Sequence, residues 1–328
     1  MPRFATIIGT GIYLPPIERS NDVMRERFGE VIDKFERPSG IKTRFYAPDD
    51  WATSDMAVEG AKAALKDAGL QASDLDMIIL GTDSPDYITP ATSAVVQHKL
   101  GADKAGTFDV GCACASFPTG LNIAAGFLST MPNMKYVMVI GAYMMHKLAD
   151  VENDVISFFY GDGAGAAILT VADKPGFVAS TFFADGSYHK HWGIYAGGTY
   201  EPITPEAISA GRHQVRLVTS FPAEVNNQGW PARMRELAAN GDFDLQDVDM
   251  ALFTQVRLNS IQIVMADLGL PMEKTHWIMD KWGYTGSACI PMVFDDARKQ
   301  GRIKSGDLVT FVGSGVGYNQ AGSAFIMP

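Results

Sequence analysis

The sequence lacks the features that mark membrane, secreted and nucleic-acid-binding proteins. No run reaches the ~18–20 apolar residues that a membrane-spanning helix needs, and the first residues contain no small-residue cleavage site. Lysine and arginine form no cluster that could follow a phosphate backbone, and the net charge is −10. We therefore expect no membrane and no nucleic acid among its partners.

Cysteine is also scarce, with Cys112, Cys114 and Cys289 the only three. A small, odd number of cysteines is typical of free thiols in a reducing cytoplasm rather than of a disulfide framework. Cys112 and Cys114 form a C-x-C pair, but no histidine lies near enough in sequence to complete a zinc site. We expect a cytoplasmic protein with no metal and no resident cofactor.

The 328 residues, 47% of them hydrophobic, suffice for two halves that share one core. Short runs rich in valine and isoleucine alternate with amphipathic stretches, which predicts an α/β fold with parallel β-α-β units. We expect strands at 4–12, 76–82, 135–141, 164–171, 248–254, 275–279, 307–313 and 321–327. We expect helices at 54–68, 114–130, 230–240, 258–268 and 286–300.

An internal repeat supports two halves. ASDLDMIILGT at 72–82 and LQDVDMALFTQ at 245–255 each follow a predicted helix. Three pairs are in register at one spacing: Asp74/Asp247, Asp76/Asp249 and Met77/Met250. The economical interpretation is a duplicated β/α unit, 1–172 and 173–328, with a loop-rich junction at 184–229. The alternative is that D-x-D-M recurs by chance before two buried strands.

The candidate nucleophile lies in TFDVGCACASFPTGLNIAAGFL at 107–128, which predicts a strand, a turn of small residues and a helix that starts near Cys114. At a helix N-terminus the unpaired amides and the helix dipole favour a thiolate, so we expect a lowered pKa for Cys114. The alternative is a buried cysteine that only fills space.

The pattern D-V-x-x-A-C-A-x-F resembles the nucleophile motif of the β-ketoacyl-(acyl carrier protein) synthase III family. The resemblance covers nearly the whole chain and assigns the nucleophile to Cys114 rather than Cys112. Its other matches are GIKTRFYAPDD at 40–50, TPATSAVVQHKLG at 89–101, FFYGDGAGAAIL at 158–169, AGGTYEP at 196–202, LGLPMEKT at 268–275, KWGYTGSACIP at 281–291 and GRIKSGDLVTFVGSGVG at 301–317.

The resemblance implies a five-layered α-β-α-β-α thiolase fold built from two duplicated halves. It implies a homodimer that pairs through the strand at 107–110, and acylation of Cys114 by a thioester of coenzyme A or of an acyl carrier protein. It also implies an oxyanion site formed by the backbone N–H of Cys114 and the segment Gly315–Val316–Gly317, with Gly315 beside the substrate. Amides aimed at the developing charge are a strong catalytic device.

Two positions depart from the family. Its histidine of H-Q-A-N and its asparagine of G-N-T, which stabilise the enolate after malonyl decarboxylation, are replaced by Thr254 in T-Q-V-R and Tyr284 in G-Y-T. A threonine hydroxyl cannot act as a base near neutrality, and a tyrosine has a pKa of ~10. We expect His146 and His276 to be structural, since neither falls on a family site position.

Two departures concern substrate binding. Thr89 precedes Pro90 where some relatives have a glutamate base, and Asn259 replaces a carrier-docking arginine, with Arg257 two residues earlier. The acidic net charge opposes docking of an acidic carrier protein, which favours coenzyme A thioesters. We therefore expect an acyltransferase that forms acyl-S-Cys114 and transfers the acyl group without malonyl decarboxylation. A thioester hydrolase and a non-catalytic partner subunit of a heterodimeric synthase are the alternatives.

Overall fold

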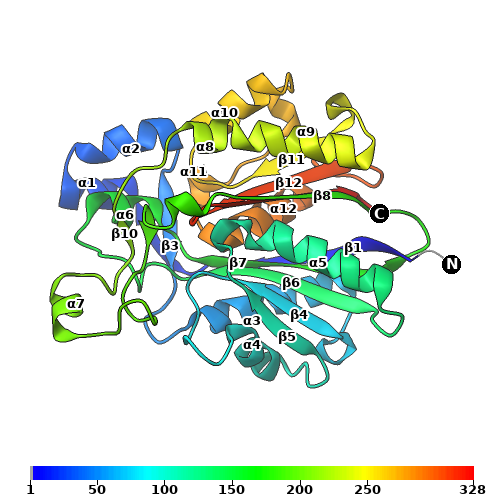
Figure 1. Ribbon diagram of the computed structural model, residues 1–328, viewed down its shortest axis with the longest axis horizontal. Helices are drawn as coiled ribbons and strands as arrows, with labels where there is room; N and C mark the ends of the chain where they lie inside the picture. Colours follow the sequence, from blue (N-terminus) through cyan, green and yellow to red (C-terminus); the bar gives the residue numbers. More distant parts are fainter. Residues whose placement is uncertain (1–2) are drawn as a thin grey trace.

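The computed structural model describes residues 3–328, which form two mixed β-sheets with helices between and outside them (Figure 1). In spatial order the first sheet contains β1 (Phe4–Tyr13), β7 (Gly163–Ala172), β6 (Tyr136–Tyr143), β4 (Met77–Gly81) and β5 (Gly106–Val110). The second contains β11 (Met250–Phe253), β12 (Leu308–Gly315), β13 (Asn319–Ile326) and β8 (Phe177–Ala184). Two ribbons pair β2 (Ile17–Ser20) with β3 (Thr43–Tyr46), and β9 (Trp192–Gly193) with β10 (Arg216–Leu217).

The helices complete five layers. Helices α5 (Ser116–Thr130) and α12 (Cys289–Lys299) lie between the sheets and contact strands of both. Helices α3 (Thr53–Ala68) and α4 (Thr92–Leu100) cover the outer face of the first sheet, while α9 (Gly229–Gly241) and α10 (Leu258–Asp267) form the opposite outer layer (Figure 1). The α-β-α-β-α order confirms the predicted thiolase fold. The other helices are α1 (Asn21–Phe28), α2 (Val31–Ser39), α6 (Asp154–Phe159), α7 (Pro205–Ser209), α8 (Glu224–Asn227) and α11 (Met279–Trp282).

The repeated D-x-D-M motif has the same structural role in both halves. The Asp76 carboxylate, just before β4, accepts hydrogen bonds from the amides of Lys135 (2.7 Å) and Tyr136 (2.9 Å) at the start of β6. The Asp249 carboxylate, just before β11, accepts one from the Leu308 amide (2.9 Å) at the start of β12. Each aspartate therefore fixes the register of the neighbouring parallel strand, because it satisfies amides that the ladder leaves free.

Most predicted elements form within three residues of their expected bounds, but the strand predicted at 275–279 is wrong. Only Thr275 makes a bridge, to Ala251, and α11 begins at the end of the range. Side chains take the hydrogen bonds that a ladder would use: the Thr275 hydroxyl donates to the Ala251 carbonyl (2.7 Å), and the Gln255 side chain accepts from the Ile278 amide (2.9 Å). The loop-rich range 184–229 lies between β8 and α9.

No helix among residues 3–328 combines the length and the apolar character that crossing a bilayer requires.

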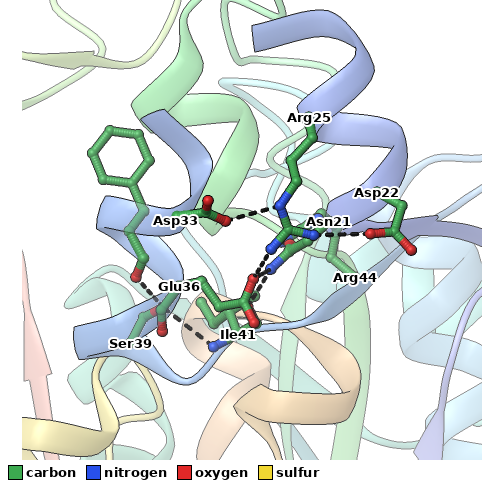
Figure 2. Close-up of polar contacts among 9 residues, drawn as sticks. Asn21, Asp22, Arg25, Asp33, Glu36, Ser39, Ile41 and Arg44 are labelled. Carbon is green, nitrogen blue, oxygen red and sulfur yellow. Dashed lines mark hydrogen bonds and ion pairs between the residues drawn. The ribbon is translucent and has the colours of Figure 1, made fainter. Parts of the chain in front are cut away.

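A network of charged side chains joins α1 to α2 (Figure 2). The Arg25 guanidinium contacts the carboxylates of Asp22 (2.8 Å), Asp33 (2.8 Å) and Glu36 (2.5 Å). The Glu36 carboxylate also accepts from the Asn21 side-chain amide at 2.8 Å. These two helices were not predicted, since their residues are mostly polar and the second contains Pro38.

Behind this network lies Arg44 of β3, which is fully buried. Its guanidinium donates to the Asn21 side-chain oxygen (2.6 Å) and to the Arg19 carbonyl (3.1 Å), and it lies 5.0 Å from the Phe158 ring centroid. Burial lowers the pKa of Arg44 to about 10. A Cβ added at Gly283 would lie 2.7 Å from the Arg44 Cβ, so Arg44 packs directly against the backbone that precedes Tyr284.

We predict that Asn21→Ala lowers the free energy of unfolding by about 1–3 kcal/mol, because the buried Arg44 guanidinium loses its side-chain acceptor. Denaturant unfolding would measure the change. The matched control is Asp22→Asn, whose side chain is 88% exposed and which we expect to change stability by less than about 0.5 kcal/mol. Equal midpoints for the two variants would contradict the prediction.

Candidate active site

The nucleophile segment is a tight turn between β5 and α5. A short 3-10 helix covers Ala113–Ala115, and Ala113 has a φ of 47°, in the left-handed region that favours glycine. The turn is held by the Ser116 hydroxyl, which donates to the Val110 carbonyl (2.9 Å) and accepts from the Cys112 amide (3.0 Å). The segment therefore presents Cys114 at a fixed place beyond the end of the strand.

The backbone of β12 approaches this turn so closely that only glycine fits. A Cβ added at Gly315 would lie 2.0 Å from the Cys112 carbonyl oxygen, and one added at Gly313 would lie 2.8 Å from the Cys114 carbonyl oxygen. The predicted oxyanion segment, which continues from Gly315 through Val316 and Gly317, therefore begins beside the nucleophile turn. Gly315 and Val316 line the same cavity as Cys114, whereas Gly317 does not.

This cavity has a volume of about 290 Å³ and brings the three predicted catalytic residues, Cys114, Thr254 and Tyr284, together with Gly315 and Val316. Its remaining wall is largely aromatic, with Tyr143, Tyr160, Trp192 and Phe221 among the lining residues. Among residues 3–328, no histidine, lysine or arginine lines it. A small, mostly apolar cleft of this kind suits an acyl chain.

Three predicted substrate-binding residues lie outside the cavity. Thr89 is exposed in the loop between β4 and α4. Arg257 and Asn259 are exposed at the start of α10, although Val256, which precedes them, lines the cavity wall. These two side chains thus lie at the surface next to the site rather than within it.

The expected lowering of the Cys114 pKa is wrong. Cys114 is 4% exposed, and burial raises the pKa of its thiol well above the ordinary value, with the nearby Asp83 carboxylate adding to the effect. The α-helix begins only at Ser116, two residues after the cysteine. Loss of hydration therefore outweighs the helix terminus, and the Cys114 thiol is protonated at neutral pH.

Tyr284 contacts the nucleophile directly. Its hydroxyl oxygen lies 2.5 Å from Cys114 Sγ, and this hydrogen bond favours the thiolate. Backbone hydrogen bonds place Tyr284, since its amide donates to the Phe159 carbonyl (3.0 Å) and its carbonyl accepts from the Gly161 amide (2.9 Å). Burial raises the pKa of the Tyr284 phenol well above its ordinary value, so it is a neutral hydrogen-bonding group.

Thr254 is buried, and its hydroxyl accepts a hydrogen bond from the Ser314 amide at 2.9 Å. The next residue, Gln255, is also buried and donates to the Phe253 carbonyl at 2.8 Å. Both side chains therefore hold the ends of β11 and β12 in place. Thr254 shapes the cavity and supplies no base.

Asp83 is the residue that sequence analysis missed. It follows β4, partly exposed, and lines the cavity with Cys114. Burial raises its pKa to about 6. The sequence offered one signal, its position directly after a predicted strand. The structure adds that β4 runs parallel to β5, with Gly81 opposite Val110, so residues just beyond both strands meet at one sheet edge.

Both histidines named above lie outside the cavity. His276 Nε2 lies 2.6 Å from an Asp296 carboxylate oxygen, and its Nδ1 faces the Arg302 guanidinium. His146 pairs with the buried Asp162 and stacks on Tyr46 at 4.9 Å. Among residues 3–328, no cluster of three or more histidine, cysteine, aspartate or glutamate side chains is placed to hold a metal ion.

We predict that iodoacetamide alkylates Cys114 slowly at pH 7 and that the rate rises about tenfold per pH unit to beyond pH 9, because only the thiolate reacts and its pKa is raised. A Cys112→Ser background removes the competing half-buried thiol, and Cys114→Ala in that background identifies the signal by mass spectrometry. A rate that levels off below pH 8 would show that the site holds a thiolate.

Comparison with known proteins agrees with this architecture. Residues 108–186 match the family described as 3-Oxoacyl-[acyl-carrier-protein (ACP)] synthase III, and residues 237–326 match its C-terminal part. The beta-ketoacyl-[acyl-carrier-protein] synthase III of Syntrophomonas wolfei is 34% identical over 317 residues, 96% of this chain and 95% of that protein. The Clostridioides difficile protein of the same name is 32% identical over 315 residues, 95% of each chain.

Two solved structures are similar over nearly their whole length. The crystal structure of 3-oxoacyl-[acyl-carrier-protein] synthase III from Aquifex aeolicus has a TM-score of 0.88 at 28% identity and covers 98% of this chain and 99% of that one. The priming beta-ketosynthase from the R1128 polyketide biosynthetic pathway has a TM-score of 0.92 at 26% identity, and the match covers 100% of this chain and 97% of that one. With the nucleophile turn, the five layers and these relatives in agreement, the chain belongs to the 3-oxoacyl-[acyl-carrier-protein] synthase III family.

Proposed function

We propose that this family member takes an acyl group from a coenzyme A thioester onto Cys114 and passes it to an acceptor without decarboxylating malonyl. The observation that carries the proposal is the makeup of the cavity. Thr254 and Tyr284 flank the nucleophile where the family resemblance implies histidine and asparagine, and no cationic side chain among residues 3–328 lines it. A site without these groups lacks the means to stabilise an enolate but keeps the means to form an acyl-enzyme.

Acylation needs a nucleophile and an oxyanion site. Cys114 Sγ attacks the thioester carbonyl carbon, the C–S bond to coenzyme A breaks, and the thiol proton leaves with the departing thiolate. The amides of Cys114 and Val316 are the donors we assign to the oxyanion, since both residues line the cavity and the predicted Gly317 does not. The Tyr284 hydroxyl, which favours the thiolate of Cys114, assists the attack.

Coenzyme A is the donor we favour. The net charge of −10 opposes approach of an acidic carrier protein. Arg257, exposed at the start of α10 beside Val256 of the cavity wall, is a cation placed to meet an anionic donor. Asn259, also exposed at the start of α10, carries no charge.

We also propose a homodimer. Within residues 3–328, strand β5 is the last strand of its sheet and pairs with β4 alone, so its other edge can pair with a second copy. Light scattering at micromolar concentration should give twice the chain mass of 35.5 kDa. A mass of 35.5 kDa would show a monomer.

Intact-protein mass spectrometry after incubation with a panel of acyl-CoAs tests the acyl-enzyme. We predict a single acyl adduct on the wild-type protein and on Cys112→Ala, and none on Cys114→Ala, because Cys114 is the one cysteine of residues 3–328 that lines the cavity. A donor that labels Cys114→Ala to the same extent would contradict this. Absence of any adduct on the wild-type protein would favour the non-catalytic partner subunit.

The pre-acylated enzyme should not decarboxylate carboxyl-labelled malonyl-CoA or malonyl-carrier protein at a useful rate. Each missing donor is worth about 3–4 kcal/mol, so loss of both should cost several orders of magnitude, although effects within one site do not add. Released carbon dioxide and the β-ketoacyl product would be measured together. Turnover at ~1–10 per second, ordinary for enzymes, would show that other residues replace the missing pair.

A further inference from the structure

The cavity contains a single acidic side chain. Among the residues of 3–328 that line it, Asp83 is the only carboxylic acid, and the other titratable groups are the Cys114 thiol and tyrosine phenols. An acceptor that enters this cavity carries a proton on its oxygen, nitrogen or carbon, and that proton must leave when the acceptor attacks the acyl-enzyme. The cavity therefore needs a base, and Asp83 is its one candidate.

No partner charge neutralises Asp83. The Ser287 hydroxyl lies 3.4 Å from an Asp83 carboxylate oxygen but only 2.9 Å from the Ala142 carbonyl. A hydroxyl has one proton to donate, so the closer carbonyl competes for it. Within residues 3–328 no lysine, arginine or histidine contributes to the pKa of Asp83. Its carboxylate thus keeps lone pairs free to take a proton.

The titratable groups that face Asp83 stay neutral. The Asp83 charge acts on four neighbouring groups: Cys114, Cys289 of α12, Tyr143 of β6 and Tyr160. Burial raises the pKa of all four above their ordinary values. Burial also raises the pKa of Asp83, to about 6. Near neutral pH the carboxylate is ionised and yet basic enough to accept a proton, which is the balance a general base requires.

We propose that Asp83 is the general base that deprotonates the acceptor in the second half-reaction, an assignment that rests on the proposed acyl-enzyme. As the acceptor atom bonds to the acyl carbon, its proton moves to the Asp83 carboxylate. The bond between that carbon and Cys114 Sγ then breaks. The proton passes from Asp83 to the released thiolate, which regenerates the thiol and the carboxylate.

The first half-reaction does not need this base. The Asp83 charge opposes formation of the Cys114 thiolate, and the coenzyme A thiolate is itself a good leaving group. Removing the charge should therefore leave acylation unchanged or make it faster, while transfer to a protonated acceptor should slow. A residue needed only for folding would impair both steps together.

The test uses Asp83→Asn in the full-length protein, with Asp103→Asn, an exposed acid, as the matched control. Each protein is acylated with the acyl-CoA that labels the wild type and freed of coenzyme A. Decay of the adduct is followed by mass spectrometry from pH 5 to 9 with water, ethanol or benzylamine as the acceptor. Hydroxylamine, which attacks thioesters without a base, checks that the adduct remains accessible.

We expect Asp83→Asn to be acylated at least as fast as the wild type and to transfer about 100-fold more slowly. The wild-type transfer rate should fall as the pH drops through about 6, because protonation removes the base, and the variant should lose this inflection. Asp83→Glu, which keeps the carboxylate, should retain an inflection and serves as the second variant if Asp83→Asn does not fold. Hydroxylamine should cleave all adducts at similar rates.

Three results would overturn the assignment. The first is a transfer rate for Asp83→Asn within about threefold of the wild-type rate. The second is an acylation rate of Asp83→Asn that falls as much as its transfer rate. The third is a wild-type acyl-enzyme that reacts with none of the three acceptors. A wild-type protein that no acyl-CoA labels would instead refute the proposed function itself. The two failures are therefore distinguishable.

Discussion

The active site depends on one constraint, the reciprocal packing of the two halves through glycine. In the second half, Gly315 of β12 lies so close to the nucleophile turn that a Cβ there would meet the Cys112 carbonyl oxygen at 2.0 Å. In the first half, Gly141 of β6 lies against the equivalent turn, where a Cβ would meet the Ser287 carbonyl oxygen at 2.1 Å. The sheet of each half therefore packs against the turn that precedes the buried helix of the other half.

This packing places Cys114, the predicted nucleophile, at the boundary between the halves. The cavity wall combines Cys114 and Asp83 from the first half with Thr254, Tyr284 and Val316 from the second. Neither half alone could form the site. The close backbone approach also explains why small residues fill both turns, since any larger side chain would push the sheets apart.

The same packing sets the chemistry of the cavity, because it buries most of the ionisable groups there. Burial raises the pKa of the Cys114 thiol and of the Tyr284 phenol well above their ordinary values, while the pKa of the Asp83 carboxyl rises only to about 6. Near neutral pH the cavity therefore contains one negative charge and a set of neutral hydrogen-bonding groups. This makeup is the basis of our proposal that the site transfers acyl groups without stabilising an enolate.

The sequence by itself determined the order of most strands and helices, the two similar halves and the family, because hydrophobic periodicity, the D-x-D-M repeat and the motif around Cys114 are local patterns; the role of Cys114 as nucleophile stays a prediction. The tertiary structure alone decided three things. It showed the range 275–279 to be irregular, since side chains of Thr275 and Gln255 compete with the ladder. It reversed the expected pKa shift of Cys114, because burial depends on elements distant in sequence. It also brought Asp83 into the cavity, since only the parallel pairing of β4 with β5 puts the ends of both strands at one edge.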